Sequence, residues 1–202
     1  MSYLYESCDD FAQRLPWSIL CNVAASCGNV EALKYFHMHG HPLDESTFTA
    51  AAISNNLACL NYLYEKKCAW DKEACDRAAL SGNLDALKFL HEKGCDWCCR
   101  TSSYAIQVGS LECLIYAHEN GCYVGGYSSH DAAYFGRLDC LKYLHQKGFV
   151  LDAFTSSSAA SNGHLDCLQF LYENGCPWDS TTPTYAAGNG HLNYIQYAHE
   201  HG

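Results

Sequence analysis

The sequence predicts an all-α solenoid of about seven stacked helical hairpins. Three observations lead to this fold: a period of 27 residues without insertion or deletion, helical spacing of apolar residues within each period, and glycine where helices should end. The clearest unit is residues 163–189, and its positions are numbered 1 to 27 for every repeat. Successive units begin at Gly28, Asn55, Gly82, Gly109, Gly136, Gly163 and Gly190.

Each unit contains two expected helices. Leu165, Leu168 and Leu171 occupy positions 3, 6 and 9, which form one face of a helix, named helix B. Gly175 at position 13 suits the end of that helix, and Asp179 at position 17 can cap a second one, helix A, that runs to about position 26. An Ala-Ala pair at positions 24 and 25 allows neighbouring helices to approach closely. One hairpin cannot bury its apolar face alone, so the units must stack.

The repeat extends over nearly the whole chain, which predicts a single domain over residues 1–202. Residues 16–27 match the second half of a unit with one residue missing, and residues 1–15 are expected to form an N-terminal cap. The sequence stops at position 13 of the seventh unit. The expected repeats are residues 16–40, 41–67, 68–94, 95–121, 122–148, 149–175 and 176–202.

Composition excludes several classes of protein. The 22 acidic and 12 basic residues give a formal charge of -10, which argues against nucleic acid as the main partner. No apolar run approaches the ~18 residues of a membrane span, and the N-terminus does not resemble a signal peptide. Fourteen cysteines in a chain without a secretion signal are expected to be free thiols in a reducing, intracellular compartment.

The repeated residues resemble ankyrin repeats. Residues 163–175, GHLDCLQFLYENG, are followed by Thr182 and by Ala186-Ala187, as in the family pattern G-H-x-x-x-V-x-x-L-L-x-x-G and T-P-L-H-x-A-A. The unit lacks about six residues of the usual ~33, between positions 17 and 20, where the family builds a β-hairpin finger. The shortened form resembles ankyrin-like arrays of large DNA viruses that infect amoebae. The resemblance implies a non-catalytic scaffold that uses no cofactor and binds proteins, with helix A lining the concave face.

Histidine and cysteine recur in the repeats, but we expect them to have packing roles. Position 10 is often His and position 14 often Cys, yet Tyr64 and Phe149 occupy these positions in other units, and phenylalanine cannot bind a metal. The alternative is a zinc site at His91, Cys95, Cys98 and Cys99. Cysteines at position 5 alternate with alanine and are expected to be small core residues.

Two other features favour packing over chemistry. Trp70 and Trp97 share position 16 with aliphatic residues in other units, so they are expected to fill space between hairpins. No phosphate-binding loop, nucleophile elbow or metalloprotease motif is present, and the sequence therefore predicts that the protein is not an enzyme.

The candidate binding surface lies on helix A. Positions 19, 22, 23 and 26 form a stripe opposite the Ala-Ala pair, and they vary strongly between units. Tyrosine and arginine, the residue types that contribute most to binding energy, gather in its middle. The candidate partner-binding residues are Arg77, Arg100, Tyr104, Gln107, Tyr127, His130, Tyr134 and Phe154.

The expected partner is a protein of unknown identity, met in the cytoplasm of a host cell if the chain is viral. The competing hypothesis is self-assembly through the solenoid ends, including a homodimer through the C-terminal repeat. That repeat keeps apolar Leu192 and Ile195 and carries Tyr194 and Tyr197, so it does not resemble a polar cap.

The interpretation of the histidines and cysteines can be tested by elemental analysis. We expect the purified, reduced protein to contain no stoichiometric zinc, because structural zinc needs four convergent ligands. One zinc per chain would contradict this interpretation and would point first to His91, Cys95 and Cys98.

Overall fold

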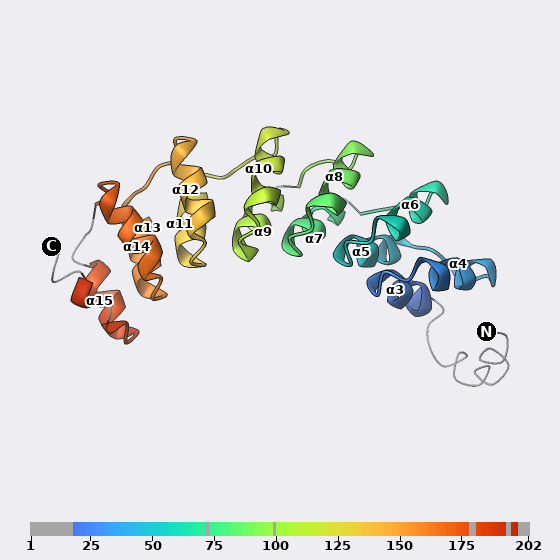
Figure 1. Ribbon diagram of the computed structural model, residues 1–202, viewed down its shortest axis with the longest axis horizontal. Helices are drawn as coiled ribbons and strands as arrows, with labels where there is room; N and C mark the ends of the chain where they lie inside the picture. Colours follow the sequence, from blue (N-terminus) through green and yellow to red (C-terminus); the bar gives the residue numbers. More distant parts are fainter. Residues whose placement is uncertain (1–17, 72, 99, 178–180, 193–194, 198–202) are drawn as a thin grey trace. The chain divides into compact units, whose positions relative to one another are not determined.

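The computed structural model describes residues 18–71, 73–98, 100–177, 181–192 and 195–197 (Figure 1). These residues form helices joined by short turns and contain no strand, so the all-α prediction is confirmed. The expected cap over residues 1–15 and the expected helix cap Asp179 lie outside the described residues. The helices are α3 (Ser18–Ser26), α4 (Val30–Met38), α5 (Glu45–Ile53), α6 (Leu57–Glu65), α7 (Ala74–Leu80), α8 (Leu84–Glu92), α9 (Thr101–Val108), α10 (Leu111–Glu119), α11 (Ser128–Tyr134), α12 (Leu138–Gln146), α13 (Ala153–Ser161), α14 (Leu165–Glu173) and α15 (Thr181–Gly188).

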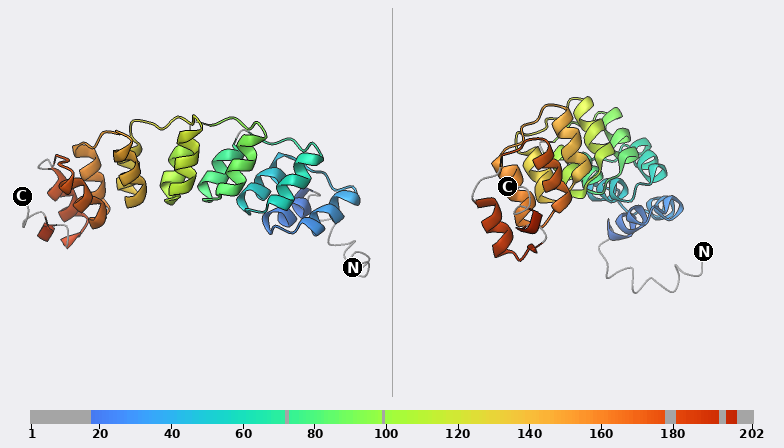
Figure 2. Two further views of the ribbon diagram at one scale, coloured as in Figure 1. Left: turned by 45° about the horizontal axis from the view of Figure 1, so that its top comes forward. Right: turned by 60° about the vertical axis from the view of Figure 1, so that its left-hand side comes forward.

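The chain divides into two compact units. The first comprises residues 1–78 with 83–98, and the second comprises residues 79–82 with 99–202, so the division runs through α7. Within the first unit, helix A α3 packs on helix A α5, and the B helices α4, α6 and α8 pack in succession. Within the second unit, α9, α11, α13 and α15 form the row of A helices, and α10, α12 and α14 form the row of B helices (Figures 1 and 2).

Helix B has the same bounds in all six described repeats, from position 3 to position 11. Position 13 follows in the left-handed conformation, with φ of +91° at Gly94, and the next amide, of Cys95, donates to the Leu90 carbonyl at 3.0 Å. This arrangement satisfies carbonyls that the helix leaves open and confirms the expected helix end. Lys67 takes this conformation with φ of +55° where the other units carry glycine.

Helix A does not begin at the same position in every repeat. In α5 and α13, the carboxylates of Asp44 and Asp152 accept the amides of Thr47 and Thr155 at 3.0 Å, and the helix begins at position 18. The expected cap is confirmed there. α9 and α11, where Cys98 and Gly125 replace the aspartate, begin two residues later, as does α7, which carries Asp71 at the capping position.

The core consists of the repeated positions. Leu33, Leu60, Leu87, Leu114, Leu141 and Leu168 at position 6 are fully buried, as are the alanines at positions 24 and 25 of α5, α7, α11 and α13. Cysteines at position 5 are buried among them, which confirms their expected role as small core residues. Position 3 was expected to belong to the buried face of helix B, but it does not. Leu57 and Leu192 are exposed, and the residues at position 3 of the other repeats are half-buried. Position 3 is the first residue of helix B and lies at the edge of the core.

Neighbouring repeats are joined by a hydrogen bond from position 2. Asn56 donates to the Gly28 carbonyl at 2.7 Å, and Asn83 donates to the Ile53 carbonyl at 2.7 Å. In the second unit, Nε of Arg137 donates to the Gln107 carbonyl at 3.0 Å. The Nε2 atoms of His164 and His191 donate to the carbonyls of Tyr134 and Ser161 at 3.0 and 3.1 Å. Each bond satisfies a carbonyl at or just after the end of helix A in the preceding repeat.

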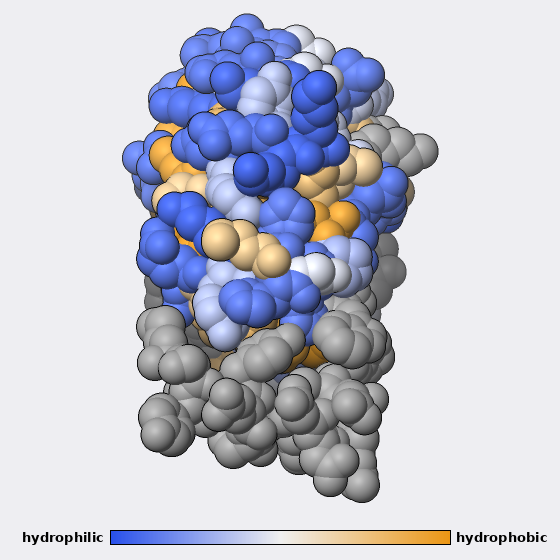
Figure 3. All heavy atoms as spheres, turned by 90° about the vertical axis from the view of Figure 1, so that its right-hand side faces the viewer, coloured by the Kyte–Doolittle hydropathy of each residue, from blue (hydrophilic) through white to orange (hydrophobic). Residues whose placement is uncertain are grey.

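Among the residues described, no helix is long and apolar enough to cross a membrane. The face in Figure 3 is largely hydrophilic, with small and separate hydrophobic areas. This distribution follows from apolar residues that face neighbouring repeats.

The core assignment predicts a large effect of Leu141→Ala. Because Leu141 is fully buried, its truncation should leave a cavity and lower the free energy of unfolding by about 2–5 kcal/mol, as measured by urea denaturation. Leu192→Ala is the matched control, since that leucine is 64% exposed and its truncation should cost less than about 0.5 kcal/mol. Equal losses in the two variants would contradict the assignment.

Candidate protein-binding surface

Most of the candidate residues lie in the second unit, on three successive A helices. They are here called the helix A stripe, and their side chains are exposed or half-buried in contrast to the buried Ala-Ala face. Tyr127 is 82% exposed and Phe154 is 75% exposed, although both are large and largely apolar. The stripe comprises Arg100, Tyr104, Gln107, Tyr127, His130, Tyr134 and Phe154.

On α9 and just before it, the stripe combines a cation with an aromatic ring. The exposed Arg100 places Cζ 5.7 Å from the centroid of the half-buried Tyr104 ring. A guanidinium over a ring face is attracted by the negative π surface. The Gln107 carbonyl accepts the bond from Arg137, so its backbone is held by the next repeat.

On α11 the stripe is a row of stacked rings. The His130 and Tyr134 rings stack with centroids 6.4 Å apart and an interplanar angle of 15°. Nδ1 of His130 lies 3.5 Å from Oδ1 of Asp131, and the Tyr134 carbonyl accepts a hydrogen bond from His164. Tyr127 precedes the first turn and projects into solvent. The sequence had placed Tyr127 and Tyr134 on one exposed stripe, and both side chains are exposed.

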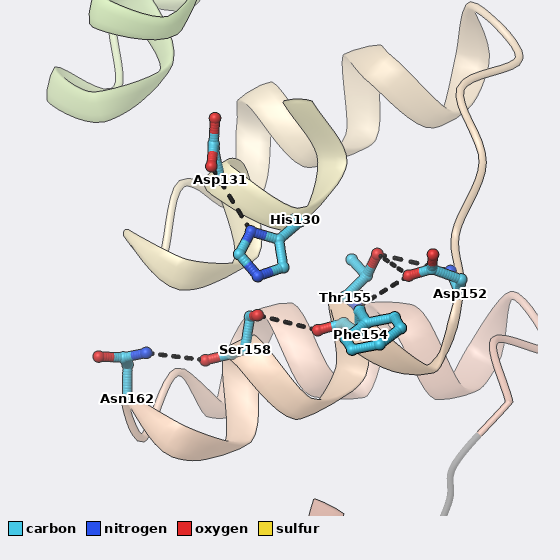
Figure 4. Close-up of polar contacts among 7 residues, drawn as sticks. All are labelled: His130, Asp131, Asp152, Phe154, Thr155, Ser158 and Asn162. Atoms are coloured by element: carbon cyan, nitrogen blue, oxygen red, sulfur yellow. Dashed lines mark hydrogen bonds and ion pairs between the residues drawn. The ribbon is translucent and has the colours of Figure 1, made fainter. Parts of the chain in front are cut away.

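On α13 the stripe is anchored by local hydrogen bonds (Figure 4). The Asp152 cap holds the first turn, next to Phe154. The Ser158 hydroxyl donates to the Phe154 carbonyl at 2.8 Å, and the His130 ring extends from α11 toward these two residues. Ser158 is therefore buried, although its position belongs to the stripe that the sequence predicted to be exposed.

The first unit contributes one candidate residue, Arg77 on α7. Its side chain is exposed, and Nη2 lies 3.5 Å from Oε2 of Glu73, one turn earlier on the chain. The neighbouring stripe position holds Asp76, which is buried rather than exposed. Arg77 is thus presented by the first unit, separately from the stripe of the second.

Sequence reasoning missed two exposed apolar residues beside the stripe. Tyr123 and Val150 at position 15 are 71% and 70% exposed, and each lies four residues before a stripe residue, Tyr127 or Phe154. The signal was available, because position 15 is Pro, Ala or Asp in the other units. The second unit therefore has apolar side chains both in its turns and on its A helices.

Comparison with known proteins identifies the repeats. A sequence model described as ankyrin repeats (3 copies) matches residues 20–101, and a second, described as ankyrin repeats (many copies), matches residues 156–199. The chain contains ankyrin repeats. The human ASB11 ankyrin repeat domain has a similar structure, with a TM-score of 0.66 and 19% sequence identity over 78% of this chain and 84% of that one. The comparison with curated proteins gives no significant match.

The recurrent histidines and tryptophans of these ankyrin repeats are engaged in packing. The His91 ring stacks on Trp97 with centroids 4.2 Å apart, and Trp70 stacks on Tyr64 at 5.6 Å. Between repeats, Nδ1 of His118 shares a hydrogen bond of 2.8 Å with the Tyr143 hydroxyl. His37 and Tyr62 form the same bond at 2.7 Å in the first unit.

The proposed zinc alternative gains no support from the described residues. No group of three His, Cys, Asp or Glu side chains in that part of the chain is arranged to hold a metal ion. Cys95 is buried and Cys98 is half-buried, while Cys99 lies outside the described residues. The zinc measurement therefore stays as the direct test.

The buried thiols of the ankyrin repeats have raised pKa values. Burial, with a smaller contribution from the carboxylates of Asp139 and Asp166, raises the pKa of Cys140 to about 11 and that of Cys167 to about 12. Burial also raises the pKa of Cys21 and Cys68 to about 11, with a contribution from Asp44. A thiol with such a pKa remains protonated at neutral pH and is a poor nucleophile.

These thiols predict a loss of stability in alkaline solution. Each keeps its proton in the folded state up to pH 11 or 12, whereas the unfolded thiol loses it near pH 9. Their contribution to stability is therefore complete below about pH 9 and declines as the pH rises toward 11 to 12. Urea denaturation at a series of pH values measures this decline, and it should be shallower in the double variant Cys140→Ala, Cys167→Ala. An unchanged slope in that variant would contradict the assignment.

Proposed function

We propose that this chain is a non-catalytic scaffold that binds a protein partner through the helix A stripe of its second unit. The observation that carries the proposal is the contrast in exposure along the A helices. The repeated alanines are buried, whereas Tyr127 and Phe154 at a varied position are more than 70% exposed. Large aromatic side chains gathered on a solvent-facing surface are typical of binding sites, because exposed rings do not stabilise the fold of the unbound protein.

The composition of the stripe supports a protein partner. It combines four aromatic residues, one arginine and one histidine, and Asp131 is a neighbouring charge. Interface cores are enriched in Tyr, Phe and Arg and depleted in Lys and Glu. The stacked His130 and Tyr134 rings and the Arg100–Tyr104 pair are already held in place, so little side-chain entropy is lost on binding.

We further propose that the partner is a host protein met in a reducing compartment such as the host cytoplasm. The shortened 27-residue unit, with its GCPWD segment at 175–179, supports a viral setting by its resemblance to viral arrays. The core supports a reducing compartment, because buried cysteines serve it as small apolar residues. Capture of partners from amoebal lysate, compared with lysate from an unrelated cell, tests this setting.

The second candidate function is self-assembly through the C-terminal repeat. Ala187 is exposed, whereas the residues at the same position of earlier repeats are buried. Leu192 is also exposed, whereas the residues at its position in earlier repeats, apart from Leu57, are half-buried. Tyr194, which had been expected to contribute, lies outside the described residues. Light scattering at micromolar concentration distinguishes the two functions, since a dimer that Leu192→Ser dissociates would favour self-assembly.

The proposed surface predicts a large effect of a double substitution. Tyr127→Ala combined with Tyr134→Ala should weaken binding to a captured partner by more than about 2 kcal/mol, or roughly 30-fold in Kd, as measured by titration calorimetry. The far-ultraviolet spectrum should remain that of the wild type, because both rings are exposed.

The matched control is the double variant Tyr64→Ala, Tyr172→Ala. It also removes two tyrosine rings, but these lie at position 10 on the B helices. This control should bind with wild-type affinity. A folded helix A variant that binds normally would exclude the stripe and would favour the helix B face or the C-terminal repeat around Tyr197.

A further inference from the structure

Two buried cysteines of the first unit face each other outside the proposed binding surface. Cys75 lies on α7 and is fully buried, and Cys95 lies in the turn after α8 and is 2% exposed. The Cys75 thiol lies 3.9 Å from the Cys95 carbonyl oxygen and also hydrogen-bonds the Cys95 side chain. The two residues are 20 apart in the sequence but share one side-chain contact.

The repeat register supports this contact independently. Cys75 occupies position 21 of one repeat, and Cys95 occupies position 14 of the following repeat. The same two positions in the second unit are Ser156 and Cys176, whose Oγ and Sγ atoms lie 3.1 Å apart. Side chains at these positions therefore meet across the boundary between repeats.

Both positions carry a thiol at one boundary within the described residues. The other boundaries pair Cys21 with His41, Phe48 with Cys68, Ser102 with Cys122, Ser129 with Phe149 and Ser156 with Cys176. A small core residue would satisfy either position, as serine does at position 21. The Cys75–Cys95 boundary thus differs from the two Ser–Cys boundaries in chemistry rather than in side-chain size.

The environment of Cys95 also differs from that of the other core thiols. Hydrogen bonds from the Cys75 side chain and backbone lower the pKa of the Cys95 thiol, even though burial acts in the opposite direction. Burial raises the pKa of Cys140 and Cys167 to about 11 and 12. Thiolate is the form that reacts with oxidants, so the lowered pKa favours reaction at Cys95 over Cys140 and Cys167 once peroxide reaches the site.

We propose that Cys75 and Cys95 form a disulfide when the protein meets a peroxide. The Cys95 thiolate attacks one oxygen of hydrogen peroxide, and the O–O bond breaks to give a sulfenic acid and hydroxide, which takes up a proton to form water. The Cys75 sulfur then attacks the sulfenic sulfur, and the S–O bond breaks as a second water leaves. Two thiols are oxidised by two electrons in total, and one peroxide is reduced to two waters.

The disulfide would tie α7 to the turn after α8 within the first unit. Because both side chains are buried, the reaction requires a local opening that admits peroxide, and it should be slower than oxidation of the exposed Cys27. The bond closes a loop of about 20 residues, which restricts the unfolded chain. It is reversed by dithiols, so it is a modification site that responds to the redox state of the cell.

The test is mass spectrometry of the full-length protein after treatment with hydrogen peroxide. Remaining thiols are blocked with N-ethylmaleimide at acidic pH, and the chain is cut with trypsin and chymotrypsin without reductant. Cleavage after Lys72, Arg77, Lys93 and Trp97 places Cys75 in peptide 73–77 and Cys95 in peptide 94–97, apart from Cys98 and Cys99. We expect these two peptides to be joined in treated protein and separated by reductant. Recovery of Cys75 as the alkylated thiol, or linkage of Cys95 to Cys98 or Cys99, would overturn the proposal.

Variants at equivalent positions provide matched controls. Ser156→Cys should create a second cross-link, to Cys176, because those side chains are already in contact. Ser129→Cys should create no cross-link, because position 14 of the next repeat is Phe149. Cys75→Ser should leave the Cys95 sulfenic acid to be trapped by dimedone. Failure of Ser156→Cys to cross-link would show that contact at these positions does not suffice, and it would contradict the argument whether or not the stripe binds a partner.

Discussion

The structure depends on the hydrogen bonds by which position 2 of five repeats holds the end of helix A in the preceding repeat. A helix leaves its last carbonyls without partners, and a side-chain donor from the next repeat supplies one. Asn56 forms two hydrogen bonds at once: its Oδ1 accepts from Cys59 and caps its own helix B, while its Nδ2 donates to the Gly28 carbonyl. Asparagine, arginine and histidine all form the bond, so what is required is a donor with sufficient reach rather than one residue type. The left-handed residue at position 1 brings the chain to that point.

This constraint explains which residues are free to bind. Once helix A is held at its end and packed through its alanines, most residues on the opposite side of the helix lie outside the core and can differ between repeats, although Asp76 and Ser158 are buried there. In the second unit the exposed residues on this side are Tyr127, Tyr134 and Phe154. Tyr123 and Val150, in the turns four residues before Tyr127 and Phe154, are exposed as well. The same logic keeps thiols in the core at position 5, because that position requires only a small buried side chain.

Much of the fold could be predicted from the sequence, because the repeat averages the signal over several copies. The helix ends, the buried leucines and cysteines, and the exposure of Tyr127 followed from position alone. The late start of α7, α9 and α11 did not, because α7 begins late even though Asp71 stands at the capping position. The burial of Asp76 and Ser158 depends on neighbouring side chains that periodicity does not contain. The bonds from position 2 were missed because their donors are chemically diverse, and a pattern search looks for one residue type.

The central claim is that packing and binding use opposite sides of the A helices. Hydrogen–deuterium exchange of the complex with a captured partner tests it most directly, because exchange reports every segment at once. The account predicts that binding slows exchange in residues 100–107, 123–134 and 150–158 and leaves the B helices α10, α12 and α14 unchanged. Protection confined to those B helices, with the A helices exchanging as in the free protein, would contradict it.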